Sequence, residues 1–245
     1  KSHNLSVLEI GYISLSAYTR LFLGDILPQS LEKVIYMDCD LIICEDLSEL
    51  WSTNINNYSV AGVSDIYIQE YLPQFIRDLG YDSKYGYINS GVLLINLRYW
   101  RENHLIDIFL SYSKEICNII KFFDQDIING TLYDTKLVLP VKYNVIESYY
   151  LRKIRLVQHK DEVYAVLTNP AIIHYTSPSK PWLKSCTHPL KGEFLKYKAI
   201  SPWKDIPLTW GKMTKSDIRK HYLERIQRAL GFRNKKYRRL SKSSK

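Results

Sequence analysis

The carboxylates Asp38 and Asp40 follow directly after the apolar run Lys33–Met37 and are well placed for chemistry. The run KVIYM predicts a buried β-strand, so both acids lie at its carboxyl end, where open α/β sheets bind ligands. Burying two negative charges costs free energy unless a cation compensates them, and oxygen ligands favour Mg²⁺ or Mn²⁺. An exposed turn with two acids is the alternative interpretation.

His174 follows a second apolar run, residues 171–173, and Lys180 comes six residues later. An imidazole beside carboxylates shifts the metal preference from Mg²⁺ toward Mn²⁺, so His174 is a candidate third ligand. Lys180 can neutralise a phosphate as a point charge. A histidine in this position is also commonly a hydrogen-bonded loop residue, and that alternative stays open.

A third group of polar residues, Phe123-Asp124-Gln125-Asp126, comes at the predicted start of a short helix. An acid at a helix start commonly satisfies free backbone N–H groups, so capping is the simplest role for Asp124. Gln125 has no capping role and therefore has the stronger case for taking part in chemistry.

The elements that position these residues alternate between strands and helices. Strands are predicted at residues 33–37, 41–44, 59–63, 92–97, 137–139 and 171–173. Helices are predicted at residues 14–27, 68–79, 99–120 and 124–132. This alternation favours an α/β fold with a mainly parallel or mixed sheet flanked by helices.

Charge is distributed unevenly along the 245 residues. Residues 1–150 hold 11 Lys/Arg and 19 Asp/Glu, a net charge of −8, whereas residues 151–245 hold 23 and 6, a net charge of +17. The total of +9 therefore does not describe a uniformly basic nucleic-acid binder, and no nucleic-acid partner is expected. With 46% hydrophobic and 24% charged residues, the composition excludes a disordered or collagen-like chain.

Residues 212–245 form a strongly basic tail with 13 Lys/Arg and 2 Asp/Glu. Apolar residues recur every four positions from Ile218 onward, which predicts an amphipathic helix capped by Ser216 and ended by Gly231. One apolar and one basic face are typical of a helix on an anionic membrane surface. A docking helix with a solvated basic face is the alternative. The final residues 233–245 are expected to be flexible.

Four motifs occur in a fixed order between residues 10 and 190: DCD after an apolar strand, YINSGVLLINLRYWR, FDQDIING and HYTSPSKPW. In this order they resemble glycosyltransferase family 8, whose type members are bacterial lipopolysaccharide galactosyl- and glucosyltransferases. The resemblance implies the GT-A fold, a Rossmann-like α/β domain. It also implies an enzyme, a hexosyltransferase that uses Mn²⁺, or Mg²⁺, in retaining transfer from UDP-galactose or UDP-glucose.

The resemblance also assigns residues to the metal and the diphosphate. Asp38, Asp40 and His174 match the metal ligands of the family. Lys180 matches the lysine that holds the diphosphate, and Arg20 matches an arginine beside the donor. A cation and a lysine aimed at the leaving UDP would stabilise the negative charge that develops there.

The sugar pocket is assigned in the same way. Asp65 and Asn89 match positions that contact the donor sugar, Asp124 falls in the same pocket, and Gln125 matches the glutamine near the reacting anomeric carbon. Retaining hydrolases use a carboxylate nucleophile, whereas an amide is a poor one. Front-face, ion-pair-like transfer is therefore favoured, with Gln125 or a backbone carbonyl steadying the sugar cation.

The resemblance divides the chain into a GT-A catalytic domain, residues 1–205, and a basic amphipathic tail, residues 206–245. The family pattern begins with a uridine-binding segment ahead of the match at Tyr12, so a catalytic domain incomplete at its N-terminus is expected. The implied partners are a UDP-sugar, a bacterial glycan or glycolipid acceptor such as lipopolysaccharide core, and an anionic membrane bound through residues 212–245. The implied location is cytoplasmic, at the inner face of the bacterial membrane.

Three other readings use the same features. A metal-dependent nucleotide-sugar phosphohydrolase would also need the paired carboxylates, the histidine and the lysine, but the placement of the INSG and DQD motifs argues against it. A catalytically impaired fragment of a transferase is the second. In the third interpretation the tail is a nucleic-acid-binding arm, but the net negative charge of residues 1–150 argues against it.

Overall fold

The computed structural model describes residues 15–155 and 160–240, and the chain divides into two units. The first unit comprises Lys1–Asp38 and Asp46–Asn144, and the second comprises Cys39–Glu45 and Val145–Lys245. The boundary therefore runs through the DCD motif itself. The division predicted at residue 205 stays a prediction.

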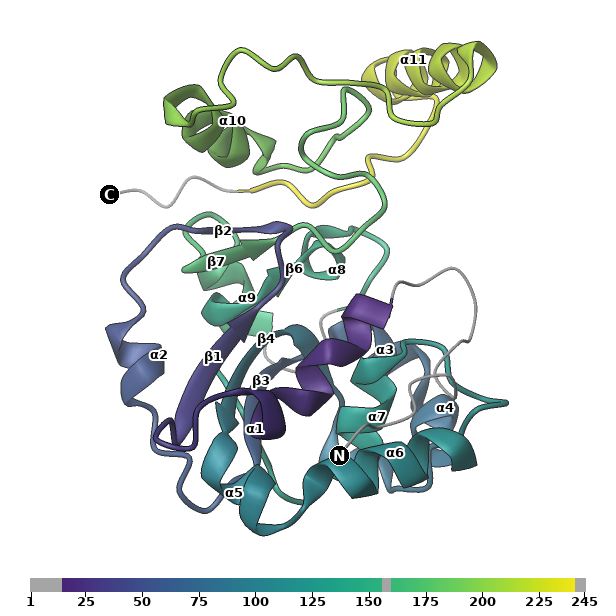
Figure 1. The fold of residues 1–245 in the computed structure, drawn as a ribbon. Helices are drawn as coiled ribbons and strands as arrows, with labels where there is room; N and C mark the ends of the chain where they lie inside the picture. Colours follow the sequence, from purple (N-terminus) through teal and green to yellow (C-terminus); the bar gives the residue numbers. More distant parts are fainter. Residues whose placement is uncertain (1–14, 156–159, 241–245) are drawn as a thin grey trace. The chain divides into compact units, whose positions relative to one another are not determined.

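The first unit is built on a four-stranded mixed sheet (Figure 1). Its strands, in spatial order, are β1 (Lys33–Met37), β4 (Ile88–Asn96), β3 (Val60–Ser64) and β5 (Lys136–Val138). β4 runs antiparallel to β1 and β3, whereas β3 runs parallel to β5. The predicted α/β fold with a mixed sheet is confirmed. The strand expected to be buried, β1, is only half-buried because it lies at the edge of the sheet.

β4 is the central strand, and every one of its residues is buried. An apolar run of this kind suits a strand covered on both faces. The strand begins earlier than predicted and includes residues 89–91, so their polar side chains enter the interior. β3 approaches β4 so closely that a Cβ at Gly62 would come within 2.9 Å of Cδ1 of Ile88. A larger residue at position 62 would therefore require the Ile88 side chain to shift.

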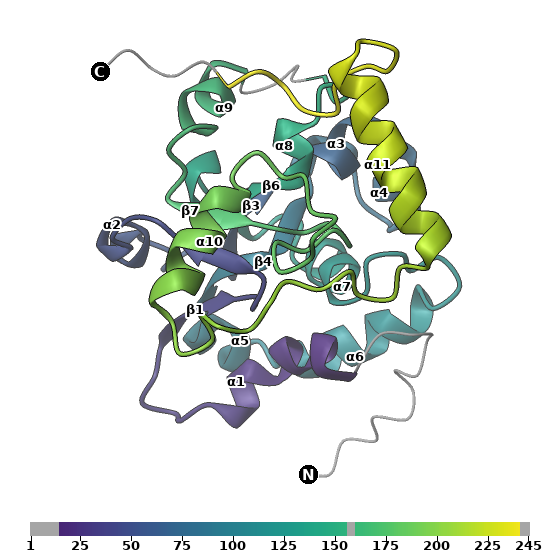
Figure 2. The ribbon, with the colours of Figure 1, turned by 90° about the horizontal axis from the view of Figure 1, so that it is seen from above.

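The helices of the first unit are a 3₁₀ helix (Leu15–Phe22), α1 (Leu23–Ile26), α2 (Ser48–Ser52), α3 (Ile66–Tyr71), α4 (Pro73–Asp78), α5 (Leu97–Glu102), α6 (Leu105–Glu115) and α7 (Asp124–Thr131), with short 3₁₀ turns at Ser83–Tyr85 and Val141–Tyr143. α1 packs against α5, and α7 packs against both α6 and β4 (Figures 1 and 2). Sheet residues such as Leu93 and helix residues such as Phe109 and Ile127 share one hydrophobic core.

Two predicted helices are each divided in two. The helix predicted at residues 68–79 is interrupted at Leu72 because Pro73 has no N–H and disfavours a helical conformation of the residue before it. The helix predicted at residues 99–120 is interrupted at His104, which adopts a left-handed conformation with φ 49°. α6 also ends at Glu115, before the predicted end.

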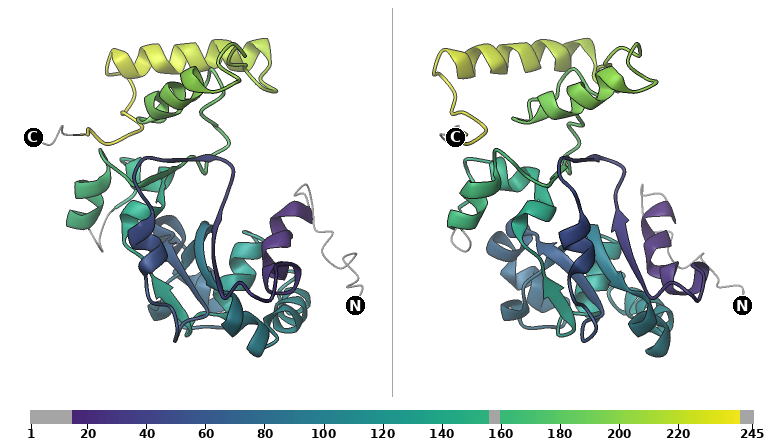
Figure 3. Two further views of the ribbon diagram at one scale, coloured as in Figure 1. Left: turned by 60° about the vertical axis from the view of Figure 1, so that its left-hand side comes forward. Right: turned by 90° about the vertical axis from the view of Figure 1, so that its left-hand side faces the viewer.

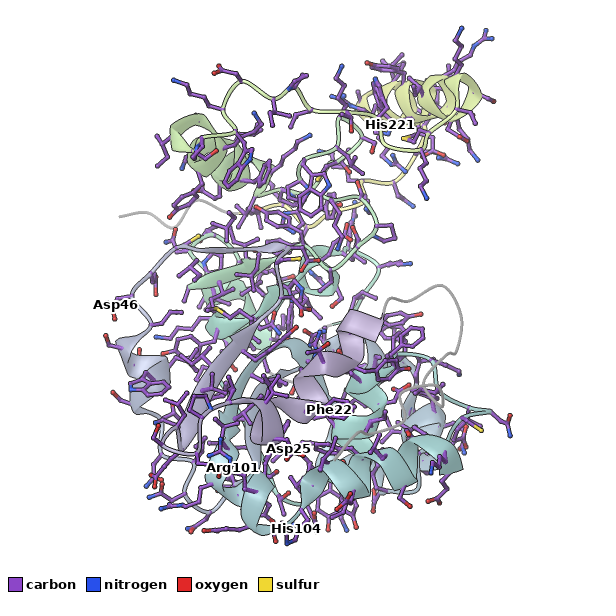
Figure 4. All side chains as sticks on the ribbon, in the orientation of Figure 1. Phe22, Asp25, Asp46, Arg101, His104 and His221 are labelled. Carbon is purple, nitrogen blue, oxygen red and sulfur yellow. The ribbon has the colours of Figure 1, made fainter. Side chains whose placement is uncertain are left out.

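Arg101 holds the connection between α1 and β1 in place (Figure 4). Its guanidinium donates hydrogen bonds to the carbonyl oxygen of Gly24 in α1 and to four carbonyl oxygens of the connection, those of Leu27, Pro28, Gln29 and Leu31. The last carbonyl groups of a helix have no hydrogen-bond partner within the helix and need donors from elsewhere. One side chain of α5 therefore fixes how the chain leads into the strand that ends at Asp38.

The second unit contains a three-stranded mixed sheet. Its strands, in spatial order, are β2 (Leu41–Ile43), β7 (Ile172–His174) and β6 (Val145–Ile146). β2 runs antiparallel to β7, with Leu41 opposite His174, and β6 runs parallel to β7. The helices are α8 (Glu147–Tyr150), α9 (Lys160–Val166), α10 (Lys191–Ile200) and α11 (Lys215–Ala229), and Figure 3 shows α11 as one unbroken helix.

α11 confirms that the basic tail contains a helix but corrects its cap. The side chain of Thr214, not Ser216, accepts a hydrogen bond from the backbone N–H of Asp217, and the Asp217 carboxylate accepts one from the backbone N–H of Thr214. This reciprocal pair is a capping box, which satisfies two free helix donors at once. At the other end, Gly231 has φ 82°, as expected for a glycine just past a helix.

The segment that follows α11 forms specific contacts with α8 and the residues after it. The flexibility predicted for residues 233–245 stays a prediction, and residues 241–245 lie outside the described residues. Tyr237 forms an antiparallel bridge with Leu151, and the N–H of Arg238 donates to the backbone of Tyr150. Lys236 Nζ and the Tyr237 hydroxyl donate to the buried Glu147 carboxylate at 2.8 and 2.5 Å. A buried carboxylate needs such donors, so it holds the segment in place.

Candidate functional site

A buried polar network joins three of the predicted donor-sugar residues in the first unit. Asp65 follows β3 and caps α3, Asn89 lies on β4, and Gln125 lies on the first turn of α7. Asn89 Nδ2 lies 3.1 Å from both Asp65 Oδ2 and Gln125 Oε1, and Gln125 Nε2 lies 3.4 Å from Asp65 Oδ2. Burial raises the pKa of Asp65, and hydrogen bonds from Asn89 and the backbone of Ile68 oppose that rise.

The amide of Gln125 is held in one orientation. Its Oε1 accepts hydrogen bonds from the Ser90 backbone N–H at 2.9 Å and from Asn89. Asn144 Nδ2 donates to Asn89 Oδ1 at 2.9 Å and so fixes the amide of Asn89 in turn. Because donors already occupy Gln125 Oε1, this oxygen is poorly suited to act as a nucleophile.

Two further side chains of α7 fix the helix that carries Gln125. The buried Asp126 carboxylate accepts hydrogen bonds from the backbone N–H groups of Lys121 and Phe122 at 2.7 Å and from the Tyr87 hydroxyl at 2.5 Å. Asn129 exchanges two 2.8 Å hydrogen bonds with the backbone of Ile88. The DQDIIN sequence thus pins α7 to β4 and to its preceding loop.

Arg20 binds two carboxylates beside this network. Its Nη2 lies 2.9 Å from Asp38 Oδ1, its Nε lies 3.1 Å from Asp124 Oδ2, and its Nη1 donates to the carbonyl oxygen of Ser90 at 2.5 Å. The Tyr36 hydroxyl donates to Asp38 Oδ1 at 3.0 Å, and the guanidinium lies over the Tyr36 ring. The Ser90 peptide therefore links two groups: its carbonyl oxygen binds Arg20, which pairs with Asp38 and Asp124, and its N–H binds the Gln125 amide.

Asp124 pairs with Arg20 and forms no side-chain cap at α7. The capping role predicted for Asp124 is therefore wrong. Burial raises the pKa of Asp124 to about 6, although the nearby Arg20 charge lowers it. A buried acid whose pKa rises toward neutrality is a common feature of functional sites.

A second cluster of charged residues lies in the second unit around Asp40. Asp40 directly precedes β2 and His174 ends β7, so the antiparallel pairing of these strands brings them together. His174 Nε2 lies 3.1 Å from Asp40 Oδ1, and Lys180 Nζ lies 2.5 Å from Asp40 Oδ2. Burial raises the pKa of Asp40, but His174 and Lys180 outweigh it and hold that pKa well below its usual range. Asp40 is therefore ionised at neutral pH.

Asp38, Asp40 and His174 form a group that could hold a metal ion. Asp38 precedes Asp40 by two residues, so the peptide link itself keeps its carboxylate near the Asp40–His174 pair. Two carboxylates and an imidazole are ligands that suit Mn²⁺ and Mg²⁺. Ionised carboxylates and a neutral imidazole are the forms that bind a metal.

Sequence reasoning missed several residues of this site. Tyr36 lies two residues before Asp38 on β1, and strand alternation places both side chains on one face, so a signal for it was present. Ser90 contributes through its backbone N–H and carbonyl oxygen, and backbone contacts cannot be predicted from the residue type. Asn144 lies outside every motif and gave no signal.

The comparisons with known proteins decide the family. The sequence model of glycosyl transferase family 8 matches residues 1–186. The chain belongs to glycosyltransferase family 8.

Relatives and solved structures agree with this assignment. General stress protein A of Bacillus subtilis is 29% identical over 206 residues, 81% of this chain and 70% of the relative. A lipopolysaccharide 1,2-glucosyltransferase of Escherichia coli is 32% identical over 201 residues, 78% of this chain and 56% of the relative. The chain thus spans between 56% and 70% of the length of the first three curated relatives.

Two crystal structures of the galactosyltransferase LgtC have a similar fold. An active-site mutant is 27% identical, with a TM-score of 0.67 over 77% of this chain and 68% of that one. The complex with donor and acceptor sugar analogues is 24% identical, with a TM-score of 0.68 over 85% and 72%. The predicted GT-A type of α/β fold is confirmed.

Proposed function

We propose that this member of family 8 is a retaining hexosyltransferase, which moves a hexose from UDP-galactose or UDP-glucose to a bacterial surface glycan such as lipopolysaccharide core. The observation that carries the proposal is the arrangement around Ser90. Its carbonyl oxygen binds the arginine that pairs with Asp38 and Asp124, and its N–H binds Gln125. Acidic, cationic and amide groups thus converge on one buried peptide, as a site for a charged sugar donor requires.

The donor set of Asp38, Asp40 and His174 fits Mn²⁺, with Mg²⁺ as the alternative. When bound, the ion would hold the diphosphate and stabilise the negative charge that develops on the leaving UDP. Lys180 would hold the same oxygens as a point charge, since its ammonium already reaches Asp40. Arg20 would orient Asp38 and Asp124 through its two ion pairs.

Asp65, Asn89 and Gln125 would bind and orient the sugar. The Oε1 atom of Gln125 already accepts two N–H groups, which supports front-face transfer over a covalent glycosyl–Gln125 intermediate. In this mechanism Gln125 and nearby backbone carbonyls steady the positive charge that develops at the anomeric carbon. No proton transfer to Gln125 is needed.

The test measures transfer and hydrolysis of UDP-galactose and UDP-glucose, with and without Mn²⁺ and an acceptor glycan. We expect metal-dependent transfer that needs the acceptor. Asp40→Asn should remove it, whereas Asp46→Asn, at an exposed acid on the loop before α2 (Figure 4), should leave it unchanged. Release of sugar 1-phosphate and UMP at equal rates with and without acceptor would instead identify a phosphohydrolase. Donor binding without turnover would identify an impaired enzyme.

The second part of the proposal is that residues 212–245 bind the anionic inner face of the bacterial membrane. On the basic helix α11, Leu223 and Ile226 are 53% and 54% exposed, and Leu230 beyond its end is 66% exposed. Exposed apolar side chains among basic ones suit insertion at a lipid surface. Among the described residues, no helix is long and apolar enough to span the bilayer.

Sedimentation with anionic liposomes tests this part. Replacing Leu223, Ile226 and Leu230 by serine should weaken binding by roughly tenfold or more, because their apolar area can no longer enter the lipid. Ile108→Ser, at an exposed apolar position on α6, is the control. Equal binding by the triple variant and the control would contradict the proposal.

A further inference from the structure

The second unit contains a strongly basic pocket that the proposed transfer reaction does not use. Its volume is about 540 Å³. Its polar lining consists of Asn234 and five basic residues, which are Arg152, Lys153, Arg228, Lys235 and Lys236. No acidic residue lines it. The pocket therefore offers hydrogen-bond donors and positive charge to whatever enters it.

Three segments distant in sequence build this pocket. Arg152 lies just after α8, Arg228 lies in the last turn of α11, and residues 234–236 belong to the C-terminal segment. The N–H of Arg152 donates to the carbonyl oxygen of Lys236 at 3.0 Å, and Leu151 pairs with Tyr237 beside it. Backbone pairing therefore holds like charges together, which costs free energy in the absence of an anion.

Only part of this positive charge is compensated. Lys236 pairs with Glu147 at 2.8 Å, and Arg228 pairs with Glu224 at 3.2 Å. Within residues 15–155 and 160–240, the side chains of Arg152 and Lys235 form no ion pair. Both are exposed, so two cations remain available to a ligand.

We propose that this pocket binds phosphate groups, in the form of a phosphomonoester or a diphosphate. The planar fork of Arg152 can bind two phosphate oxygens at once, Lys235 supplies a point charge, and Asn234 adds an amide donor. The volume lies in the range of small-molecule sites, so a diphosphate or a phosphorylated sugar fits. A soluble phosphate ester and a phosphorylated lipid headgroup share this chemistry. The site does not depend on the transfer reaction.

Calorimetric titration with inorganic pyrophosphate, in buffer freed of divalent ions and at fixed ionic strength, tests the pocket. Arg152→Gln with Lys235→Gln should weaken binding by roughly tenfold or more, since two charge-assisted contacts are lost. Arg219→Gln with Lys220→Gln, on exposed positions of α11, removes the same charge outside the pocket and should change the affinity by less than about twofold. Equal unfolding temperatures of the two double variants exclude a folding defect.

Vesicles then identify the source of the phosphate. Phosphatidate presents a phosphomonoester, whereas phosphatidylglycerol at equal surface charge presents only a diester. A selective loss of phosphatidate binding in the pocket variant assigns the site to lipid headgroups, and a loss of pyrophosphate binding alone assigns it to soluble phosphates. The proposal is overturned if wild-type protein does not bind pyrophosphate, or if both double variants lose the same affinity.

Discussion

Gln125 is the residue whose substitution tests the proposed mechanism most directly. Its amide is buried, and both of its ends form hydrogen bonds with the residues expected to hold the sugar. Gln125→Ala should lower kcat by about 100-fold, because the developing positive charge loses a fixed dipole, while donor KM changes by less than about threefold. Steady-state kinetics with Gln74→Ala, at an exposed glutamine, as the control measures both. Unchanged turnover would contradict the assigned role.

The prediction for Arg20 concerns the stability of the fold. It is buried and pairs with Asp38 and Asp124, so Arg20→Ala leaves the buried Asp124 without its cation. We expect a loss of about 3–5 kcal/mol in the free energy of unfolding, as for other buried pairs that lose one partner.

Adding Asp124→Asn to Arg20→Ala tests that explanation. The neutral amide removes the uncompensated charge and should restore part of the lost stability. Urea unfolding of the single and double variants measures the difference. If the double variant is as unstable as Arg20→Ala alone, the ion pair is not what Arg20 contributes.

The nine predicted site residues lie in three contacting groups, although their roles stay predictions. Asp38 and Asp40 could be found from the sequence because two acids at a strand end are a local signal. The contact between Asp65 and Gln125 joins residues 60 positions apart, and only the packing of α7 on β4 creates it. Local patterns name candidates, but long-range contacts are set by the whole fold.

At the scale of elements, the corrected cap of α11 gives a direct prediction. Thr214→Ala removes the hydroxyl that accepts from the Asp217 N–H and should destabilise the helix by ~1 kcal/mol. Ser216→Ala, inside the helix, should have almost no effect. Hydrogen exchange of the α11 amides measures local opening, and equal protection in the two variants would contradict the cap.

The sequence contains signals for helix ends that the prediction of helices did not use. Thr214 with Asp217 three residues later is a capping-box signature, and Pro73 marks the start of a new helix. Both features were visible without the structure. The break at His104, where the backbone is left-handed, was not visible, because no proline or glycine stands there to mark it.

At the scale of the molecule, His188 couples the stability of the second unit to pH. Its ring lies among those of Tyr150, Tyr175 and Tyr237, and burial lowers its pKa to about 4 from the ordinary 6.5. The unfolded chain binds a proton between these two pH values and the native protein does not, so stability falls as the pH drops from 6.5 to 4. This one group accounts for about 3 kcal/mol at most.

The measurement is the free energy of unfolding as a function of pH. His188→Gln, which cannot take up a proton, should flatten the profile between pH 6.5 and 4. His104→Gln, at an exposed histidine of the first unit, is the control. An unchanged slope in His188→Gln would show that other groups dominate the acid response.

The organisation of the whole chain was only partly visible in the sequence. The change from acidic to basic composition near residue 150 lies close to residue 145, where the chain enters the second unit for good. The earlier crossing at residues 39–45 could not be predicted, because it depends on β2 pairing with β7, which is more than 120 residues away in sequence. A linear division into domains cannot represent such an exchange.

The pairing of the C-terminal segment with α8 has a consequence for a cleaved chain. A protease that cut the exposed connection between α10 and α11 would produce a C-terminal piece with no covalent link to the rest. That piece would stay bound, because Lys236 and Tyr237 still hold Glu147 and the backbone of Arg238 still reaches Tyr150. A nicked preparation would therefore run as two fragments in a denaturing gel and as a single species in native gel filtration.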